Sequence, residues 1–329
     1  MRNGDNAIAS ASITPGGAGS GRRPGWAAGF LLGSLGILAF SFSFPATKLA
    51  LDGFDPWLVA FGRAAIAGLL AAAYLAAVEA PAPTPAQRRR LAIVAGGVIV
   101  GFPLFSSLAL VTSDSAHGAV VIAILPAATA LFAVVRAGER PGPVFWLAAA
   151  AGLAVMLAYM LHQASGALTA ADAFLLAGIA CCGLGYAEGG ALSRELGGAR
   201  TISWALVLSL PLTIPVTLVT ASTTTIDAHR TAVLGLAYVA VISMLLGFFA
   251  WYAGLARGGV ARVGQIQLAQ PLLTVLLSAL VLGETLTPVM LLASAGVLVS
   301  VAATQRARVG VKPRRTRRAA SPEPARART

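Results

Sequence analysis

Charged residues are scarce in this chain, and their scarcity excludes an ordinary soluble protein. Of the 329 residues, 11% are charged and 57% are hydrophobic, whereas a soluble domain has about 25% charged residues. A soluble protein of this length would need far more polar surface than the sequence supplies. Apolar stretches near the length of a bilayer span, roughly 20 residues, recur along the chain, and they predict an all-α membrane protein.

Cysteine and histidine are also rare, with two and three residues respectively. Cys181 and Cys182 are adjacent within an apolar segment, which leaves neither a disulfide framework nor a metal-ligand spacing. His117, His162 and His229 lie far apart in the sequence. The sequence therefore predicts no metal site and no cofactor.

Motifs typical of enzymes and of ATP-driven pumps are missing from the sequence. There is no metalloprotease histidine pair, no nucleophile elbow and no phosphate-binding glycine loop. These absences argue against an intramembrane enzyme and against ATP as an energy source used by this chain.

The net charge of +12 does not indicate nucleic-acid binding, because the basic residues lie in tails and loops. Nine of the 24 lysines and arginines lie between Arg306 and Arg328, and three more lie near the N-terminus. Residues 1–24 are rich in Gly, Ser and Ala, so we expect a disordered tail there. Residues 305–329 are expected to form a basic cytoplasmic tail.

The apolar stretches predict ten transmembrane helices, joined by short connections. Their approximate ranges are 26–50, 57–78, 91–111, 117–136, 143–162, 172–192, 201–220, 231–255, 262–282 and 287–304.

Loop charge predicts the orientation of these spans, since cytoplasmic loops carry an excess of Lys and Arg. With the N-terminus inside, 21 basic residues fall on the cytoplasmic side and three, Lys48, Arg63 and Arg230, on the outer side. The chain is therefore expected in the cell (inner) membrane with both termini in the cytoplasm, which requires an even number of spans.

The sequence also repeats itself at an interval of 145 residues. Pro126 falls on Pro271, Gly138-Glu139 on Gly283-Glu284, and the alignment has 11 identities in 28 ungapped positions. The predicted repeats span residues 25–163 and 170–304, with five helices each. Because five is odd, the second unit enters the membrane in the opposite orientation, as in transporters built from inverted repeats.

Motifs in the first two spans and in each repeat resemble those of a known family. The first span ends in Phe44-Pro45-Ala46-Thr47-Lys48, the second carries Arg63 after Pro56-Trp57, and each repeat has an apolar span with an internal proline that closes in Gly-Glu. This layout resembles the EamA-type family of the drug/metabolite transporter superfamily. The resemblance implies ten helices, cytoplasmic termini and secondary transport of small metabolites, often export.

We therefore expect a secondary active transporter that exports a small metabolite or drug-like compound by alternating access, with protons as the coupling ion. The alternatives are an intramembrane enzyme, or a structural membrane protein without transport activity. A central cavity between the halves would favour the transporter, and converging acid, base or nucleophile side chains would favour the enzyme. Partners other than substrate, lipid and protons are not required, and neither is an oligomer.

One polar stripe in the ninth span is a candidate for substrate binding. Gln267, Gln270, Thr274 and Ser278 are spaced so that they fall on one helical face, and polar residues in a span usually face the bundle interior or a cavity. The alternative is hydrogen bonding between helices, worth about 0.6 kcal/mol on average.

Ionisable residues inside spans are the next candidates. Glu188 is a candidate proton carrier, although it could instead pair with Arg194 near the inner boundary. Arg63 could bind a substrate carboxylate, or pair with one of three aspartates: Asp52, Asp55 and Asp114.

Three aromatic residues and two prolines complete the candidate site. Tyr186, Trp251 and Tyr252 could line a cavity, although aromatic residues at such depths often belong to the interface belt. Pro126 and Pro271 lie inside their spans, where proline kinks a helix. The kink is either static or a hinge that lets the half-helix move.

Two further patterns have structural interpretations. Gly138-Glu139 and Gly283-Glu284 each close a span, so each glycine is expected at the helix end and each acid is expected to cap or pair locally. The glycine pairs Gly29–Gly33 and Gly97–Gly101 fit close helix packing.

Overall fold

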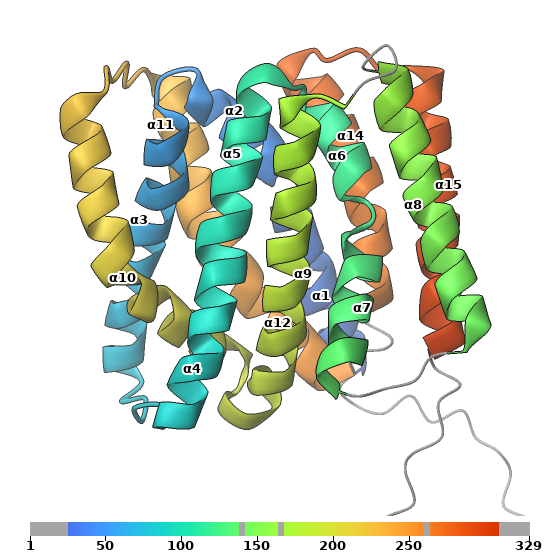
Figure 1. Ribbon diagram of the computed structural model, residues 1–329. Coiled ribbons are helices and arrows are strands. Elements are labelled where there is room, and N and C mark those ends of the chain that lie inside the picture. Colours follow the sequence, from blue (N-terminus) through green and yellow to red (C-terminus); the bar gives the residue numbers. More distant parts are fainter. Residues whose placement is uncertain (1–25, 138–141, 164–167, 259–263, 309–329) are drawn as a thin grey trace, which may run out of the picture.

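The computed structural model describes residues 26–137, 142–163, 168–258 and 264–308, and every regular element in these ranges is a helix. Figure 1 shows the helices side by side in a single bundle. The last helix, α15, continues to Arg308, so residues 305–308 of the predicted tail are helical. The predicted tails at 1–24 and 309–329 lie outside the described residues, and so does the predicted helix end at Gly138-Glu139.

The described residues of the first half form nine helical elements. They are α1 (Trp26–Ser41), α2 (Ser43–Leu51), α3 (Pro56–Ala77), α4 (Pro85–Val94), the π-helix η1 (Ala95–Gly101), α5 (Phe102–Thr112), α6 (Ser115–Ile122), α7 (Leu125–Ala137) and α8 (Pro143–Gln163), followed by α9 (Ala170–Leu196), which opens the second half.

The remaining described elements complete the second half. They are α10 (Gly198–Thr223), α11 (Arg230–Ala237), the π-helix η2 (Tyr238–Gly247), α12 (Phe248–Gly258), the 3-10 helix η3 (Gly264–Ala269), α14 (Gln270–Leu282) and α15 (Pro288–Arg308).

Element boundaries recur at the interval of 145 residues seen in the sequence. Adding 145 to the bounds of α7 (125 and 137) gives those of α14 (270 and 282), and adding it to those of α8 (143 and 163) gives those of α15 (288 and 308). The π-helix η1 likewise maps to 240–246, inside η2. The backbone thus repeats even where the side chains differ.

Length and composition suit these helices to a bilayer. Within the described residues, seven helices are long and apolar enough to cross a membrane, and three shorter apolar helices span Ser115–Thr129, Ile266–Leu282 and Pro288–Ala303. Large apolar side chains also face outward, such as Leu280 at 71% and Leu292 at 74% exposure. A soluble protein rarely exposes so much apolar surface, whereas lipid tails cover it readily.

Local signals explain where several helices begin. Asp55 accepts a hydrogen bond from the Trp57 N–H, and Pro56 follows it at the first helical position, where its missing N–H is not needed. A capping box of Thr84 and Gln87 begins α4. As a result, α4 begins six residues before the predicted start of the span at 91, and these residues include three arginines.

The two prolines predicted to kink their spans instead mark helix breaks. Residues 123–124 form a turn between α6 and α7, and Pro126 lies in the first turn of α7. Pro271 lies in the first turn of α14, after the 3-10 helix η3. Proline is tolerated in a first turn because the N–H that it lacks would be unpaired there.

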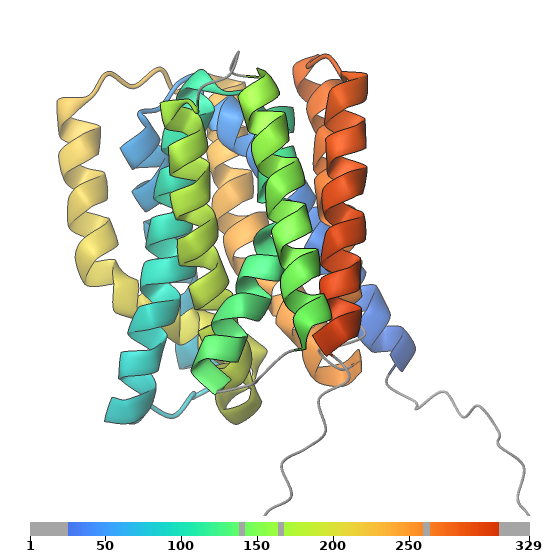
Figure 2. The same cartoon turned by 45° about the vertical axis from the view of Figure 1, so that its right-hand side comes forward.

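Two clusters of buried side chains hold the bundle together. One joins α6, α8, α9 and α15, and the other joins α1, α3, α4, α10 and α12. Figure 2 shows α8 and α15 lying side by side at one edge of the bundle, where they pack along their length. Helix α9 contributes to both clusters and lies near the centre.

Glycines allow several helices to approach closely, as the small-residue spacing predicts. A Cβ atom at Gly97 would lie 2.4 Å from the Cys181 carbonyl oxygen and 2.9 Å from the Gly185 Cα atom. A Cβ atom at Gly254 would similarly lie 2.6 Å from the backbone nitrogen of Gly33. Helices η1 and α12 therefore contact α9 and α1 through backbone atoms.

Candidate functional site

An internal cavity of about 50 Å³ lies inside the bundle. Elements from both halves of the chain line it: α1, α2, α3, η1, α5, α6 and α7 from the first, and α9, η2, α12 and α14 from the second. The lining side chains belong to Phe40, Ser43, Phe44, Arg63, Val98, Phe102, Pro103, Ser106, Ile122, Leu125, Cys182, Tyr186, Ser243, Met244, Phe248, Gln270 and Thr274.

Four of the residues singled out in the sequence line this cavity together. They are Arg63, Tyr186, Gln270 and Thr274, which come from α3, α9 and α14. Helix α14 thus turns part of its polar stripe toward the cavity. Ser278, further along the stripe, is buried and bonded at 2.8 Å to the Ser115 hydroxyl, so that end of the stripe joins two helices.

The other three candidates for substrate contact lie away from the cavity wall. Gln267 is half-buried in η3. Trp251 and Tyr252 are buried in the core cluster that joins α1, α4 and α10 to α12. Their bulk fills space between helices in this conformation.

Arg63 is buried, with 4% of its surface exposed. Its Nη1 lies 3.4 Å from the Thr47 hydroxyl, which is a long hydrogen bond, and its Nε has no hydrogen-bond partner. Within the described residues, none of the three aspartates considered as partners forms an ion pair with it. The cavity wall therefore carries a cation that forms no ion pair with a carboxylate of the described residues.

Serines and aromatic rings missed in the sequence complete the cavity wall. The hydroxyls of Ser43 and Ser243 are 2.6 Å apart and connect α2 to the π-helix η2. The rings of Tyr186 and Phe248 meet edge-to-face, with centroids 6.0 Å apart. Serine is common in apolar spans, so its spacing alone does not reveal which serines face each other.

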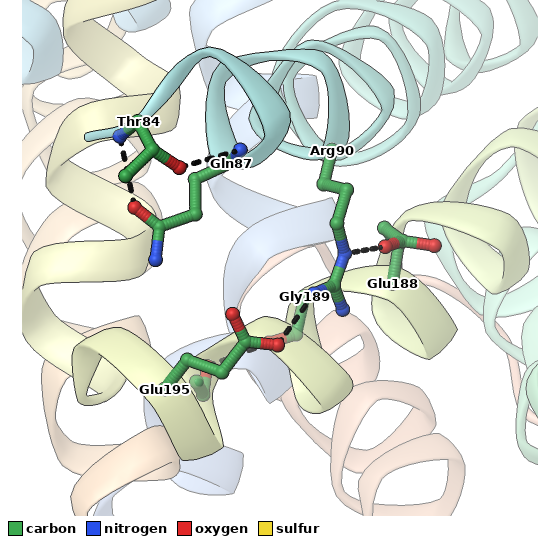
Figure 3. Close-up of polar contacts among 7 residues, drawn as sticks. Thr84, Gln87, Arg90, Glu188, Gly189 and Glu195 are labelled. Atoms are coloured by element: carbon green, nitrogen blue, oxygen red, sulfur yellow. Dashed lines mark hydrogen bonds and ion pairs between the residues drawn. The ribbon is translucent and has the colours of Figure 1, made fainter.

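Glu188 pairs with an arginine different from the one considered in the sequence. Figure 3 shows Arg90 of α4 reaching between Glu188 and Glu195 of α9, with its Nε bonded to Glu188 and its Nη1 to Glu195. Glu188 is 3% exposed, whereas the Glu195 side chain is 48% exposed. The described ion pair therefore joins α9 to the neighbouring helix α4, and not to Arg194 of α9 itself.

The carboxylate of Glu284 caps a helix far away in the sequence. Its Oε1 accepts from the Ser115 N–H at 2.9 Å and its Oε2 from the Ala116 N–H at 2.7 Å. The expectation of a local cap is therefore wrong: Glu284 caps the N-terminus of α6. Gly283, with φ of 69°, provides the left-handed turn that follows α14.

A cluster of hydrogen-bonded side chains at the start of α9 was not predicted from the sequence. His117 Nε2 lies 2.8 Å from an Asp172 carboxylate oxygen, and His117 Nδ1 lies 3.1 Å from the Tyr159 hydroxyl. The other Asp172 oxygen accepts from the Thr169 backbone and hydroxyl. Within the described residues, no group of three or more His, Cys, Asp or Glu could hold a metal ion.

Comparisons with known proteins place the chain in a family of membrane transporters. The EamA-like transporter family matches residues 27–161 and again 169–305. The chain is 46% identical over 278 residues, 84% of its length, to the uncharacterized transporter YdeK of Bacillus subtilis (strain 168), of which it covers 97%.

A protein of solved crystal structure has the same fold. Its TM-score is 0.59 at 21% identity, and the match covers 85% of this chain and 98% of that one. The family match in two copies confirms the resemblance drawn from the sequence. The chain is thus a multi-pass membrane protein with a small-molecule substrate, and it belongs to the EamA-like transporter family.

Proposed function

We propose that this protein is a secondary active transporter that exports a small metabolite or drug-like compound by alternating access. The observation that carries the proposal is the cavity, which is lined by elements of both halves and contains polar side chains from each. Substrate sites of transporters with inverted repeats lie between the halves near the midplane. No converging set of catalytic side chains lines this cavity, so an enzyme has no comparable support among the described residues.

The proposed architecture is ten spans in two inverted five-helix repeats. The seven long apolar helices and the three shorter ones together give ten, and the boundaries repeat at an interval of 145 residues. Five spans per unit reverse the orientation of the second unit. Breaks in equivalent places, before Leu125 and before Gln270, support a related role for α7 and α14.

We propose that the protein lies in the cell (inner) membrane. In the proposed orientation, both termini lie in the cytoplasm. The basic residues on the two sides divide 21 to 3, as counted in the sequence. The Arg90 cluster then lies at the cytoplasmic end of the bundle, and the Glu284 cap lies at the outer end.

The proposed substrate contacts are Arg63, Tyr186, Gln270 and Thr274 on the wall, with Gln267, Trp251 and Tyr252 reached in another conformation. The breaks at Pro126 and Pro271 would let the half-helices α7 and α14 tilt independently of the segments before them. Broken helices at a substrate site are a recurring feature of such transporters.

Purified protein in sealed vesicles tests the transport proposal. An export screen of an overexpressing strain against an empty control first identifies compounds, and uptake of each is then measured with and without an imposed pH gradient. Accumulation driven by the gradient supports secondary transport coupled to protons. Failure of every compound to cross faster than in protein-free vesicles would contradict the proposal.

Glu188→Gln is expected to abolish the response to the pH gradient. We propose that protonation of Glu188 removes the charge that attracts Arg90, which releases α4 from α9. Glutamine keeps the size of the side chain but cannot carry the proton. Gradient-driven uptake should fall by about tenfold or more, consistent with the general contribution of proton-transfer groups, while exchange of substrate without a gradient should persist.

Glu195→Gln is the matched control, because Glu195 bonds the same arginine but is half exposed to solvent. We expect it to retain gradient-driven uptake. If Glu188→Gln transports as the wild type does, the proton carrier lies elsewhere, and the His117–Asp172 pair becomes the next residues to test.

A further inference from the structure

The charge of Arg63 is the feature of the cavity that indicates a bound ligand. Among the described residues that line the cavity, Arg63 alone is charged. It is 4% exposed, and its Nε lacks a partner. A guanidinium has five N–H donors in a planar fork that matches a carboxylate, and here one of them makes a long bond to Thr47.

Burial of an unpaired cation inside a membrane protein is unfavourable, so it persists where function requires it. The positive charge of Lys48, by contrast, is satisfied by backbone carbonyls. Lys48 donates to the Leu110 carbonyl at 2.7 Å and to the Ser113 carbonyl at 3.0 Å, and it thus caps the end of α5. One positive charge therefore faces the cavity, and it would be balanced by one negative charge.

The rest of the wall defines the uncharged part of the ligand. Phe44, Phe102 and Phe248 present aromatic rings, and the polar groups near them are neutral, among them Ser243 and Gln270. No carboxylate lines the cavity within the described residues, so an ammonium group would find no counter-charge there. A second negative charge on the ligand would also stay unbalanced.

We propose that the substrate is a small organic monocarboxylate with an apolar body and no positive charge, whose carboxylate binds Arg63. The guanidinium donates two hydrogen bonds to the carboxylate oxygens, and the apolar body lies against the aromatic rings. This inference names the substrate class of the proposed transporter and so rests on that proposal, but binding can be measured without transport.

Equilibrium binding to the purified full-length protein in detergent tests this inference. The probes are radiolabelled benzoate, phenylacetate and hexanoate, with benzamide, benzylamine and phenyl phosphate as competitors. We expect saturable binding of at least one of the three acids. The neutral amide, the cationic amine and the dianionic phosphate should compete about tenfold less well than the matched acid or not at all.

Arg63→Gln should weaken acid binding by about tenfold or more, and Arg63→Lys should retain part of it because the charge remains. Arg89→Gln, which removes an exposed arginine in the middle of α4, is the control and should bind as the wild type does. The melting temperature separates function from folding: removal of an unpaired buried cation should leave it unchanged or raise it. A merely structural arginine would lower it.

Three outcomes would overturn the inference: no saturable binding of any acid, equal binding by Arg63→Gln, or tighter binding of phenyl phosphate than of benzoate. Its failure is distinct from failure of the transport proposal. If vesicles transport a neutral or cationic compound, and the Arg63→Gln variant transports it equally well, the substrate inference is contradicted and the transport proposal stands. If acids bind in a manner that depends on Arg63, but no gradient drives their transport, the substrate inference stands and the transport proposal is contradicted.

Discussion

Gly97→Ala is expected to remove most of the folded protein. The added Cβ atom would lie 2.4 Å from the Cys181 carbonyl oxygen and 2.9 Å from the Gly185 Cα atom. Both are backbone atoms of α9, so no side-chain rotation relieves the overlap, and η1 must separate from the central helix. Overpacking costs about 3 kcal/mol or more where the neighbours cannot move. Thermal melting in detergent and the yield of monodisperse protein measure the loss.

Gly96→Ala provides the matched control in the same π-helix. A Cβ atom at Gly96 meets no heavy atom within 4 Å, and the residue is exposed. Because alanine restricts the unfolded chain more than glycine does, we expect the melting temperature to stay equal or rise slightly. Equal loss of folded protein in both variants would show that the π-helix requires glycine itself, and would contradict the close contact with α9 as the cause.

Glu284→Ala is expected to destabilise the contact between α6 and α14 and to lower the free energy of unfolding by about 1.5–3 kcal/mol. The carboxylate accepts from two N–H groups at the N-terminus of α6, where a negative charge also interacts favourably with the helix dipole. Removal of the side chain leaves Ser115 N–H and Ala116 N–H without these acceptors. The melting temperature in detergent gives the size of the effect.

Two further variants locate this effect. Glu284→Gln keeps one good acceptor and loses the charge, so its melting temperature should fall between those of the wild type and Glu284→Ala. Glu79→Gln, at an exposed glutamate after α3, should melt as the wild type does. A Glu284→Ala protein as stable as the wild type would mean that water replaces the carboxylate without loss.

The positions of the spans were predictable because the length of each apolar stretch limits where a transmembrane helix can begin and end. The predicted range 57–78 differs by one residue at each end from α3, and 143–162 ends one residue before α8 does. The first span was predicted as one helix, yet the helix is interrupted at Phe42, between α1 and α2. Its run of apolar residues continues through the break, so hydrophobicity carries no sign of it. The π-helix η1 was not predicted either, although Pro103, which cannot donate to the carbonyl four residues earlier, lies two residues after its end.

The candidate site was predictable where a residue was unusual for its surroundings. Arg63 and Gln270 stand out in apolar spans, and both line the cavity. Partners were less predictable, because they come from helices that are distant in the sequence. Arg90 lies 98 residues from Glu188, and Glu284 lies 169 residues from Ser115. Neither pairing follows from helical periodicity, which specifies the face of one helix and not its neighbour.

The recurrence of element boundaries has an evolutionary consequence. A duplicated backbone with matching element boundaries and a π-helix in each copy keeps the same helix geometry in both copies. The side chains of the two copies differ, and one carries Arg63 while the other carries Glu188. Substitutions in one copy can therefore change the side chains on the cavity wall without altering the backbone arrangement that both copies share, which suits such a scaffold to acquire new substrates by few substitutions.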